Sequence, residues 1–335
     1  MTKKIAINGF GRIGRIATRI IFEQNLPLEV VAINDLTDTE TLAHLFAFDS
    51  TFGRFQGDVS ADESSINING KKIATFAEKD PSLLPWKDLG VDIVLECTGV
   101  FCKRAGMEKH IAAGAKRVIL SAPAKDEIDG TFVMGVNEND FDPAKHVILS
   151  NASCTTNCLA PVVKVIDEEF GIVKGLMTTI HSFTGDQRLL DAPHRDLRRA
   201  RTATSSMVPT TTGAAKAVGL VLPNLKGKLN GFAVRVPTPD VSLVDVTAEL
   251  SREVSKEDIN AALKKASETS LKGILGYEER LLVSCDFVGE NLSSVVDAKS
   301  TMTIGNMAKV VAWYDNEWGY SRRLCDLAVF VAERS

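Results

Sequence analysis

The run KIAINGFGRIG, residues 4–14, decides the fold of the chain. Lys4–Asn8 is mostly apolar and predicts a strand, and Arg12–Gln24 has the periodicity of a helix. Gly9, Gly11 and Gly14 lie in or beside the connecting turn. Glycines in this context allow a tight turn, close approach of the backbone to a pyrophosphate, and close packing of helix on strand. The run therefore predicts the first unit of a dinucleotide-binding sheet.

The first half of the chain continues this alternation of strand and helix. Short apolar runs between amphipathic stretches predict parallel strands with right-handed crossovers, as in a doubly wound Rossmann sheet. Asn69-Gly70 adds a hairpin signal. The other expected elements are strands 29–34, 91–96, 117–121 and 147–150 and helices 39–46 and 103–113.

Asp35 strengthens the prediction of a nucleotide site. It ends the second predicted strand, roughly 20 residues past the glycines, where an acidic residue holds ribose hydroxyls. A carboxylate there would repel a 2′-phosphate, so NAD is preferred over NADP. The alternative is that Asp35 only caps the next helix. Cys97 follows the strand that ends at Glu96 and is interpreted as a small core residue.

The second half has longer, partly alternating predicted strands, typical of a mostly antiparallel sheet with helices on one face. We expect an α+β catalytic domain over residues 154–318 after an NAD-binding domain over 1–153, with a closing helix, 319–335, that packs back on the first domain. The segment between His181 and Pro209 is basic and irregular, which favours a functional or interface role. The expected elements are strands 175–181, 231–236, 242–250 and 309–314 and helices 154–170, 256–269 and 321–333.

Cys154 lies in the run SNASCTTN, residues 150–157, among small polar residues. Ser153 is a suitable N-cap, so Cys154 is expected in the first helical turn, where open N–H groups and the helix dipole favour a thiolate. Cys158 shares its helix face. It is either a resolving thiol or a buried small residue, and the awkward geometry of an i,i+4 disulfide favours the buried residue.

His181 ends an apolar strand just before the irregular segment. If it lies beside Cys154, it would lower the thiol pKa and act as a general base, but spacing alone does not show proximity. The other histidines are predicted to be surface or capping residues. They are His44, His110, His146 and His194.

Composition excludes several classes of function. The 335 residues are 44% hydrophobic and carry a net charge of −4, which indicates neither a nucleic-acid nor a membrane partner. No apolar run is long enough to span a bilayer, and the N-terminus has no signal-peptide pattern. The six cysteines have no disulfide framework spacing, and we expect a cytoplasmic protein without a metal centre.

A dinucleotide site and an activated cysteine in one chain suggest covalent aldehyde oxidation. Several arginine and hydroxyl residues fall near the predicted cleft and suit phosphate oxygens. Each is alternatively a surface residue, and the basic cluster 198–201 is alternatively an interface.

Five ordered runs resemble the phosphorylating NAD-dependent glyceraldehyde-3-phosphate dehydrogenase family over essentially the whole chain. They are residues 7–15, 150–157, 210–218, 235–239 and 313–321. The resemblance implies that Cys154 is the nucleophile and His181 its base. It implies a homotetramer that oxidises glyceraldehyde 3-phosphate to 1,3-bisphosphoglycerate through a Cys154 thioester, in glycolysis or gluconeogenesis.

The resemblance also implies the binding residues. Inorganic phosphate would be held by Ser153, Thr155, Arg199, Thr212 and Gly213. The phosphate of the substrate would be held by Thr184, Asp186 and Arg235, with Arg235 a candidate for both sites. NAD would contact Gly9, Gly11, Arg12, Ile13, Gly14, Asp35, Lys79, Ser121 and Asn316.

Other functions stay open at this stage. An erythrose-4-phosphate dehydrogenase shares the fold, the cysteine and the histidine, but Thr212-Gly213 favours the phosphorylating family. A non-catalytic nucleotide-binding or adhesion protein is disfavoured because four residues are intact, Cys154, His181, Arg235 and Asn316. A peroxide-sensing role of Cys154 is compatible with a low-pKa thiol.

Overall fold

The computed structural model describes residues 2–334, which form two compact units. The first contains residues 2–132, 138–152 and 321–334, and the second contains 133–137 and 153–320. The chain changes unit between Ala152 and Ser153, one residue before the boundary expected from the sequence. Each unit is built on a sheet of its own.

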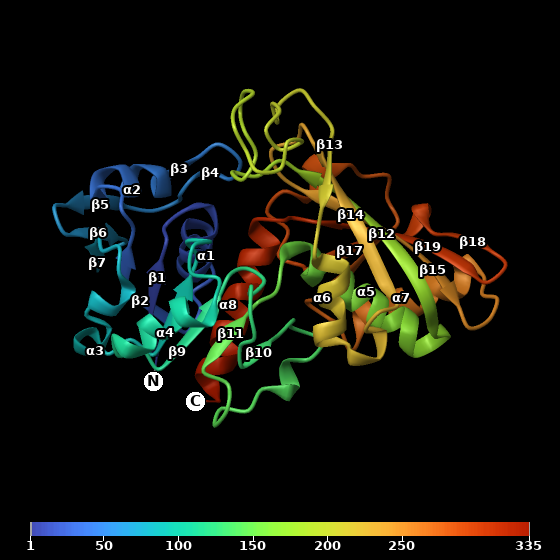
Figure 1. Cartoon of the computed structure of the whole chain (residues 1–335), viewed down its shortest axis with the longest axis horizontal. Helices are drawn as coiled ribbons and strands as arrows, with labels where there is room; N and C mark the ends of the chain where they lie inside the picture. The colour runs from blue at the N-terminus through green and yellow to red at the C-terminus, as the bar shows by residue number, and fades with distance from the viewer. Residues whose placement is uncertain (1, 335) are drawn as a thin grey trace. The chain divides into compact units, whose positions relative to one another are not determined.

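The first unit has a nine-stranded sheet in the order β10-β11-β9-β8-β1-β2-β7-β6-β5 (Figure 1). All pairs from β10 to β7 are parallel, and β5, β6 and β7 form an antiparallel meander. The predicted Rossmann-type fold class is therefore confirmed for this unit. Its strands are β1 (Lys3–Asn8), β2 (Leu28–Asn34), β5 (Val59–Asp62), β6 (Ser65–Ile68), β7 (Lys71–Phe76), β8 (Ile93–Glu96), β9 (Arg117–Leu120), β10 (Gly130–Thr131) and β11 (Ile148–Ser150).

Helices join the parallel strands where the sequence predicts them. The predicted hairpin turn is also present, because Asn69 and Gly70 both have left-handed φ angles, of 51° and 80°, between β6 and β7. A two-stranded ribbon of β3 (Phe48–Asp49) and β4 (Gly53–Arg54) follows α2. The helices are α1 (Arg12–Glu23), α2 (Thr39–Ala47), α3 (Trp86–Leu89) and α4 (Arg104–Ala112). The last helix, α8 (Trp318–Glu333), belongs to this unit from Ser321 onward.

Two glycines make the turn between β1 and α1 possible. Gly9 has φ +92°, and a Cβ there would lie 2.6 Å from the backbone N of Thr98. A Cβ on Gly14, in the first turn of α1, would overlap the carbonyl oxygen of Gly9. Gly11 differs, because a Cβ there would meet nothing within 4 Å. The close contacts of helix and strand are therefore at Gly9 and Gly14, whereas Gly11 leaves the start of α1 open.

A buried polar network joins the carboxyl ends of β1 and β8. Glu96 accepts hydrogen bonds from Asn8 Nδ2 at 2.5 Å and from the Thr98 amide at 2.8 Å. His110 accepts a bond from Trp86 Nε1 at its Nδ1 and therefore donates from Nε2 to Glu96, at 3.1 Å. The sequence prediction of a surface or capping role for His110 is wrong, since its side chain is completely buried. Its helical context gave no sign that the opposite face of α4 packs on the sheet.

The second unit has an eight-stranded sheet that is mostly antiparallel, as predicted. Its order is β13-β14-β12-β15-β19-β17-β16, with β18 paired to β19. Two pairs are parallel, β12 with β14 and β16 with β17. The strands are β12 (Ile172–Ser182), β13 (Val208–Thr211), β14 (Leu229–Val236), β15 (Ser242–Leu250), β16 (Leu275–Glu278), β17 (Ser294–Asp297), β18 (Met302–Ile304) and β19 (Met307–Tyr314).

Helices cover one face of this second sheet (Figure 1). The helix α5 (Cys154–Phe170) packs on β12, β15, β17 and β19, while α6 (Ala214–Val221) packs on β14 and α7 (Lys256–Glu268) on β16. Burial alternates strictly along β15, as expected for a sheet with one covered face. No helix in the described chain is both long and apolar enough to cross a bilayer.

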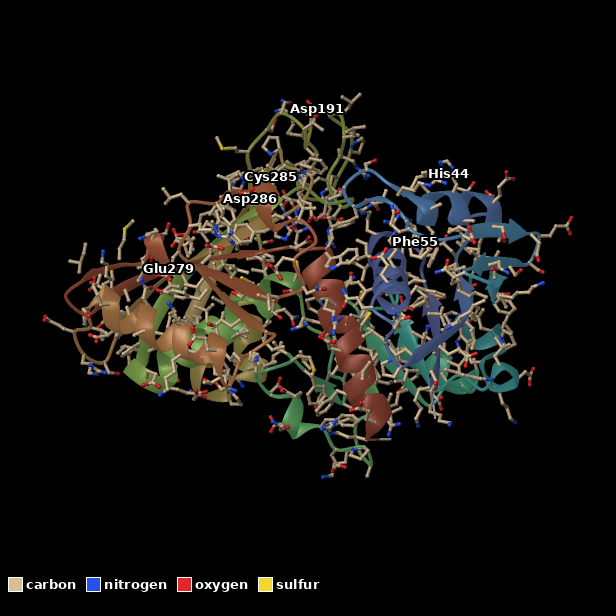
Figure 2. All side chains as sticks on the ribbon, turned by 180° about the vertical axis from the view of Figure 1, so that it is seen from behind. His44, Phe55, Asp191, Glu279, Cys285 and Asp286 are labelled. Carbon is tan, nitrogen blue, oxygen red and sulfur yellow. The ribbon has the colours of Figure 1, made fainter. Side chains whose placement is uncertain are left out.

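The segment between β12 and β13 forms a long loop that reaches its tip near Asp191 (Figure 2). It is held by local contacts, in which Asp191 accepts hydrogen bonds from Arg201 Nε and from the amide of Thr202. The loop begins directly after His181 and Ser182, so its conformation is tied to the end of β12.

The glycine contacts lead to a stability prediction. Gly14→Ala should lower the melting temperature of the NAD-free protein, because overpacking costs roughly 1–3 kcal/mol. Gly11→Ala is the matched control, since its Cβ meets nothing within 4 Å, and it should melt close to the wild type. Differential scanning calorimetry of both variants measures the difference, and equal melting temperatures would contradict the packing role of Gly14.

Candidate active site

Cys154 is the first residue of α5, as the sequence predicts. Ser153 is the N-cap, and its Oγ accepts a hydrogen bond from the Thr156 amide at 3.0 Å. Just before it, Ala152 has a φ of 54°, in the left-handed region that few non-glycine residues adopt. This sharp turn sets Cys154 at a helix start, where the backbone N–H groups are open.

His181 lies within contact of Cys154. Its Nε2 is 3.5 Å from the Cys154 Sγ. The parallel pairing of β12 with β14 sets Arg235 directly opposite His181, and Arg235 Nη1 lies 2.8 Å from His181 Nδ1. The carbonyl oxygen of Ser182 is 2.7 Å from the same Nδ1 and 3.0 Å from Arg235 Nη1.

The two neighbours of Nδ1 favour different tautomers. Arginine only donates, so a bond from Arg235 requires a bare Nδ1 and places the ring proton on Nε2, facing Cys154. A bond to the Ser182 carbonyl instead requires a proton on Nδ1 and leaves Nε2 free to accept the thiol proton. A base role for His181 therefore needs the second arrangement, in which Arg235 bonds to Ser182 and not to the ring.

Burial changes the charge balance that the sequence predicts. It raises the pKa of the Cys154 thiol, an effect that the charge of Arg235 and hydrogen bonds from Thr155 only partly oppose. Burial and the charge of Arg235 also lower the pKa of His181 to about 3. The backbone N–H groups at the helix start favour a thiolate, as the sequence predicts, but they offset the effect of burial only in part. A neutral base within contact, His181, is what can remove the proton.

Tyr314 packs against His181 and bonds to the residue that follows Cys154. It is fully buried at the end of β19, and its hydroxyl shares hydrogen bonds with Thr155 at 2.9 Å and Thr179 at 2.8 Å. Its ring meets that of His181 edge to face, with centroids 5.9 Å apart. Thr155 is thus committed to a structural bond beside Cys154, in addition to the phosphate contact that the resemblance implies.

Arg199 is the arginine of the 198–201 cluster that turns inward. It pairs with Asp186 and bonds to Thr210 Oγ1 at 2.9 Å. Its charge contributes to lowering the pKa of both His181 and Arg235, whose guanidinium carries a buried Nε without a hydrogen-bond partner. By contrast, Arg198 and Arg201 are exposed.

The other residues of the expected phosphate sites lie at two neighbouring helix starts, except Thr184, which follows β12. Gly213 is the N-cap of α6, and Thr212 Oγ1 accepts the amide of Ala214 at 3.2 Å. Thr156 in α5 bonds to the carbonyl of Ala214, at 3.4 Å, which brings the starts of α5 and α6 together. Thr184 is half-buried two residues after β12, and its amide is 3.4 Å from Gln187 Oε1.

Asn316 is oriented by two hydroxyl groups. Its Oδ1 accepts hydrogen bonds from Ser182 Oγ at 2.8 Å and Ser242 Oγ at 2.6 Å. Because the oxygen is fixed in this way, the amide nitrogen is left to donate. Neither serine stood out in the sequence, although Ser182 directly follows His181.

In the first unit, a pocket of about 350 Å³ lies at the carboxyl ends of β1, β2 and β8. This is where doubly wound sheets bind their ligands. Gly9, Gly11, Asp35 and Lys79 line it, together with Thr98. Asp35 accepts the amide of Phe10 at 2.8 Å and so braces the glycine turn. The pocket, the open start of α1 and the carboxylate fit a dinucleotide.

Three further expected NAD contacts are Arg12, Ile13 and Ser121, and Cys97 is the cysteine that follows β8. The guanidinium of Arg12 pairs with Asp49 beside the start of α1. Ile13 is half-buried in the first turn of α1, and Ser121 follows β9 with its amide bonded to the Glu96 carbonyl at 2.9 Å. Cys97 was expected in the core; it lines the pocket and is partly exposed, but burial still raises its pKa to about 12.

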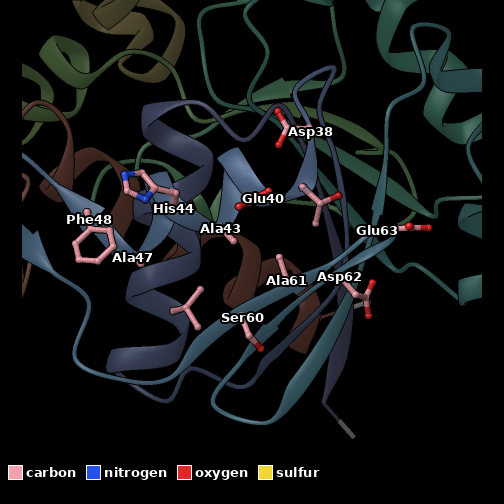
Figure 3. A pocket seen from close by; sticks show the side chains of 12 residues that line it. Asp38, Glu40, Ala43, His44, Ala47, Phe48, Ser60, Ala61, Asp62 and Glu63 are labelled. Carbon is pink, nitrogen blue, oxygen red and sulfur yellow. The ribbon is translucent and has the colours of Figure 1, made fainter.

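A larger hollow of the first unit lies between α2 and β5 (Figure 3). Its walls carry Asp38, Glu40, Asp62 and Glu63, whose charges would repel the phosphates of a nucleotide. No group of three His, Cys, Asp or Glu side chains within residues 2–334 is arranged to hold a metal ion. We therefore assign no site to this hollow.

Two further cysteines differ from Cys154 in burial or position. Cys158 is completely buried, as favoured from the sequence, with its Sγ 3.3 Å from Ser294 Oγ, and burial raises its pKa to about 12. Cys285 lies beside Asp286 on the surface of the second unit (Figure 2). All six cysteines are free thiols.

Along its whole length the chain is similar to known proteins. Residues 3–104 match the family described as "Glyceraldehyde 3-phosphate dehydrogenase, NAD binding domain", and residues 153–316 match "Glyceraldehyde 3-phosphate dehydrogenase, C-terminal domain". The chain belongs to the glyceraldehyde-3-phosphate dehydrogenase family. The resemblance stated from five sequence motifs is thereby confirmed, and so is the prediction of an NAD-binding domain.

Individual members of the glyceraldehyde-3-phosphate dehydrogenase family match over nearly their full length. The enzyme of Geobacillus stearothermophilus is 60% identical over 335 residues, which cover 100% of this chain and 99% of the relative. Glyceraldehyde-3-phosphate dehydrogenase 1 of Bacillus subtilis is 58% identical over 335 residues, with the same coverage of 100% and 99%. The Streptomyces coelicolor enzyme is 57% identical over 336 residues, covering 100% of both chains.

The contact between Cys154 and His181 predicts the reactivity of the thiol. His181→Asn should slow alkylation of Cys154 by iodoacetamide at neutral pH, because the buried thiol then lacks the base that takes its proton. The rate is measured by mass spectrometry of the Cys154 peptide, with exposed Cys285 in the same sample as the internal control. An unchanged Cys154 rate would show that His181 does not activate it.

Proposed function

We propose that this chain catalyses the phosphorylating oxidation of glyceraldehyde 3-phosphate to 1,3-bisphosphoglycerate with NAD, in glycolysis or gluconeogenesis. The observation that carries the proposal is the constellation at the start of α5. There a cysteine, a neutral histidine 3.5 Å away and a partly unpaired arginine lie together in a family of glyceraldehyde-3-phosphate dehydrogenases.

Cys154 is the proposed nucleophile and His181 the proposed base. His181 Nε2 takes the thiol proton as Sγ adds to the aldehyde carbon, and it returns that proton to the aldehyde oxygen, which gives a neutral hemithioacetal. The open N–H groups at the start of α5 stabilise the negative charge that develops on the aldehyde oxygen. His181 then accepts the proton of the hemithioacetal hydroxyl as the carbon is oxidised, which leaves a thioester on Cys154.

The second half of the reaction needs an inorganic phosphate. Its oxygen attacks the thioester carbonyl, the carbon–sulfur bond breaks, and Cys154 leaves as a thiolate while the acyl phosphate departs. The proposed binding groups are Ser153, Thr155, Arg199, Thr212 and Gly213. Support comes from the adjoining starts of α5 and α6, which present open N–H groups and positive dipole ends to an anion.

Arg235 is the proposed clamp for the substrate's own phosphate, with Thr184 and Asp186. Its Nε is buried without a hydrogen-bond partner, a state that an anion would relieve. A phosphate bound there would also neutralise the charge that opposes protonation of His181. Substrate binding and the strength of the base would therefore be linked through this arginine.

NAD is the proposed cofactor, and when bound it would accept the hydride from the hemithioacetal carbon. Gly9, Gly11, Arg12, Ile13 and Gly14 would offer backbone to the pyrophosphate. Asp35 would accept from the ribose hydroxyls and favour NAD over NADP, and Lys79, Ser121 and Asn316 are the other proposed contacts. The fixed amide of Asn316 suits donation to the nicotinamide carboxamide oxygen.

We also propose that the protein is a cytoplasmic homotetramer. Six free thiols fit a reducing compartment. On the second sheet, Leu176 and Phe232 are 69% and 48% exposed, and in the long loop Leu189 and Leu190 are 69% and 74% exposed. Apolar exposure of this extent supports association with further copies of the chain. Light scattering after gel filtration measures the assembly, and a monomer would contradict it.

The proposed reaction is tested by NADH formation from glyceraldehyde 3-phosphate with and without inorganic phosphate. Sustained turnover should need phosphate, because only phosphate or a substitute releases the acyl group efficiently. Cys154→Ser should abolish turnover while NAD binding persists. Faster oxidation of erythrose 4-phosphate than of glyceraldehyde 3-phosphate would overturn the assignment of the substrate.

The clamp role of Arg235 is tested by a charge-conserving substitution. Arg235→Lys keeps the charge but loses the planar fork, so KM for glyceraldehyde 3-phosphate should rise far more than KM for unphosphorylated glyceraldehyde. The expected loss is about 1.5–3 kcal/mol, the scale of a hydrogen bond to a charged group.

Arg198→Lys is the matched control, because Arg198 is exposed and its guanidinium donates to the carbonyl of Pro209, at 3.2 Å. It should leave both KM values near those of the wild type. Equal losses for both aldehydes in Arg235→Lys, with a lower melting temperature, would show a structural ion-pair role in place of the clamp.

A further inference from the structure

Two carboxyl groups lie buried against each other in the second unit. Asp240, in the turn between β14 and β15, is 4% exposed, and Asp315, in the turn after β19, is 1% exposed. The antiparallel pairing of β15 with β19 sets Ser242 opposite Tyr314, which brings the two turns together. The two carboxyl groups are close enough for each to affect the ionisation of the other.

The two carboxyl groups have unequal partners. Asp315 accepts three backbone amides, from Gly289 at 2.8 Å, Glu317 at 2.9 Å and Trp318 at 2.6 Å. Within residues 2–334, neither oxygen of Asp240 receives a well-formed bond from an N–H or O–H group. Two buried carboxylates this close repel unless one of them carries a proton.

The surroundings decide where that proton lies. The charged groups that act on Asp240 are both acidic, Asp315 and Glu317. Burial and these neighbours raise the pKa of Asp240 to about 9. Burial also raises the pKa of Asp315, to about 6, but its three amide partners favour the charged form. At neutral pH the proton therefore belongs to Asp240 and the charge to Asp315.

Both turns lead directly to Asn316. This residue follows Asp315, and its Oδ1 accepts from Ser242 Oγ, two residues after Asp240. Between them, Val241 has a φ of +64° although it is β-branched and buried, so the turn is strained and needs external support.

We propose that protonated Asp240 donates a hydrogen bond to ionised Asp315, and that this shared proton holds the two turns that position Asn316. Asp240 is thereby a positioning residue, and its effect on NAD rests on the proposed role of Asn316. The proton couples the fold to pH. Because the pKa of Asp240 is raised above its ordinary value near 4, the unfolded chain releases a proton that the folded chain keeps. The contribution of the Asp240 proton to the free energy of unfolding is fully present below the ordinary pKa of aspartate. It decreases as the pH rises from there to about 9.

Asp240→Asn and Asp315→Asn form a matched pair of tests. Asparagine at 240 is isosteric and donates at every pH, so this variant should fold and keep the bond to Asp315. Asparagine at 315 would turn an amide group towards three backbone N–H donors, so this variant should melt below the wild type at every pH. A proton on Asp240 predicts this asymmetry.

Two quantities are measured on the full chain from about pH 6 to about 9.5. The melting temperature of the NAD-free protein should fall with rising pH more steeply in the wild type than in Asp240→Asn, which should melt several degrees higher at the alkaline end. The dissociation constant for NAD, followed by tryptophan fluorescence, should rise several-fold over this range in the wild type relative to Asp240→Asn.

Each outcome decides a part of the proposal. Parallel melting profiles, or an Asp240→Asn variant as destabilised as Asp315→Asn, would overturn the shared proton. Separated melting profiles with identical NAD profiles would overturn the positioning of Asn316. The melting profiles need neither NAD nor substrate, so their failure is distinct from a failure of the dehydrogenase assay.

Discussion

Burial of the Cys154 thiol is the constraint on which the rest of the second unit depends. A buried thiol resists ionisation, so a base must lie in contact with it, and that base must itself be neutral near pH 7. Burial and Arg235 keep His181 neutral. The charge of Arg235 also opposes the imidazolium that proton transfer creates. Without a bound anion, the equilibrium therefore favours the neutral thiol and the neutral imidazole over the ion pair. What tips this balance has to be an anion, since negative charge near Arg235 lowers the cost of a proton on His181.

The topology of the second sheet explains how these groups come to one place. The sheet is mostly antiparallel, yet β12 and β14 run in parallel, so both end at the same edge. That pairing sets His181 opposite Arg235, whereas an antiparallel neighbour would turn its own end away. The start of α5 lies at the same edge, because Cys154 contacts His181. The turn before β15 and the turn after β19 also meet there, through Ser182 and Asn316. The direction of the strands thus determines which side chains meet at this edge of the sheet.

The sequence predicted the elements well because local signals and tertiary packing agree. The packing of Gly14 on Gly9, the Asn69-Gly70 turn and the Ser153 cap are local features, and each is present in the structure. Features that depend on distant residues were not predictable in the same way. The burial of His110 depends on Trp86 and Glu96, and the raised pKa of the Cys154 thiol depends on how the unit packs around it. The orientation of Asn316 by Ser182 and Ser242 also joins three separate segments, none of which carries a local signal for it.

Asp35 shows why a local and a functional interpretation need not exclude each other. The sequence left open whether it caps the following segment or holds a ribose. In the structure its Oδ1 accepts the amide of Thr37 at 3.1 Å, and its Oδ2 accepts the amide of Phe10 at 2.8 Å. A carboxylate has about four lone-pair sites, so two remain for hydroxyl donors at the pocket that it lines. The bond to Phe10 also fixes the turn between Gly9 and Gly11. A substitution at Asp35 therefore alters the glycine turn as well as the proposed ribose contact. An altered preference between NAD and NADP can arise from either effect, so the conformation of the glycine turn has to be measured in the same variant.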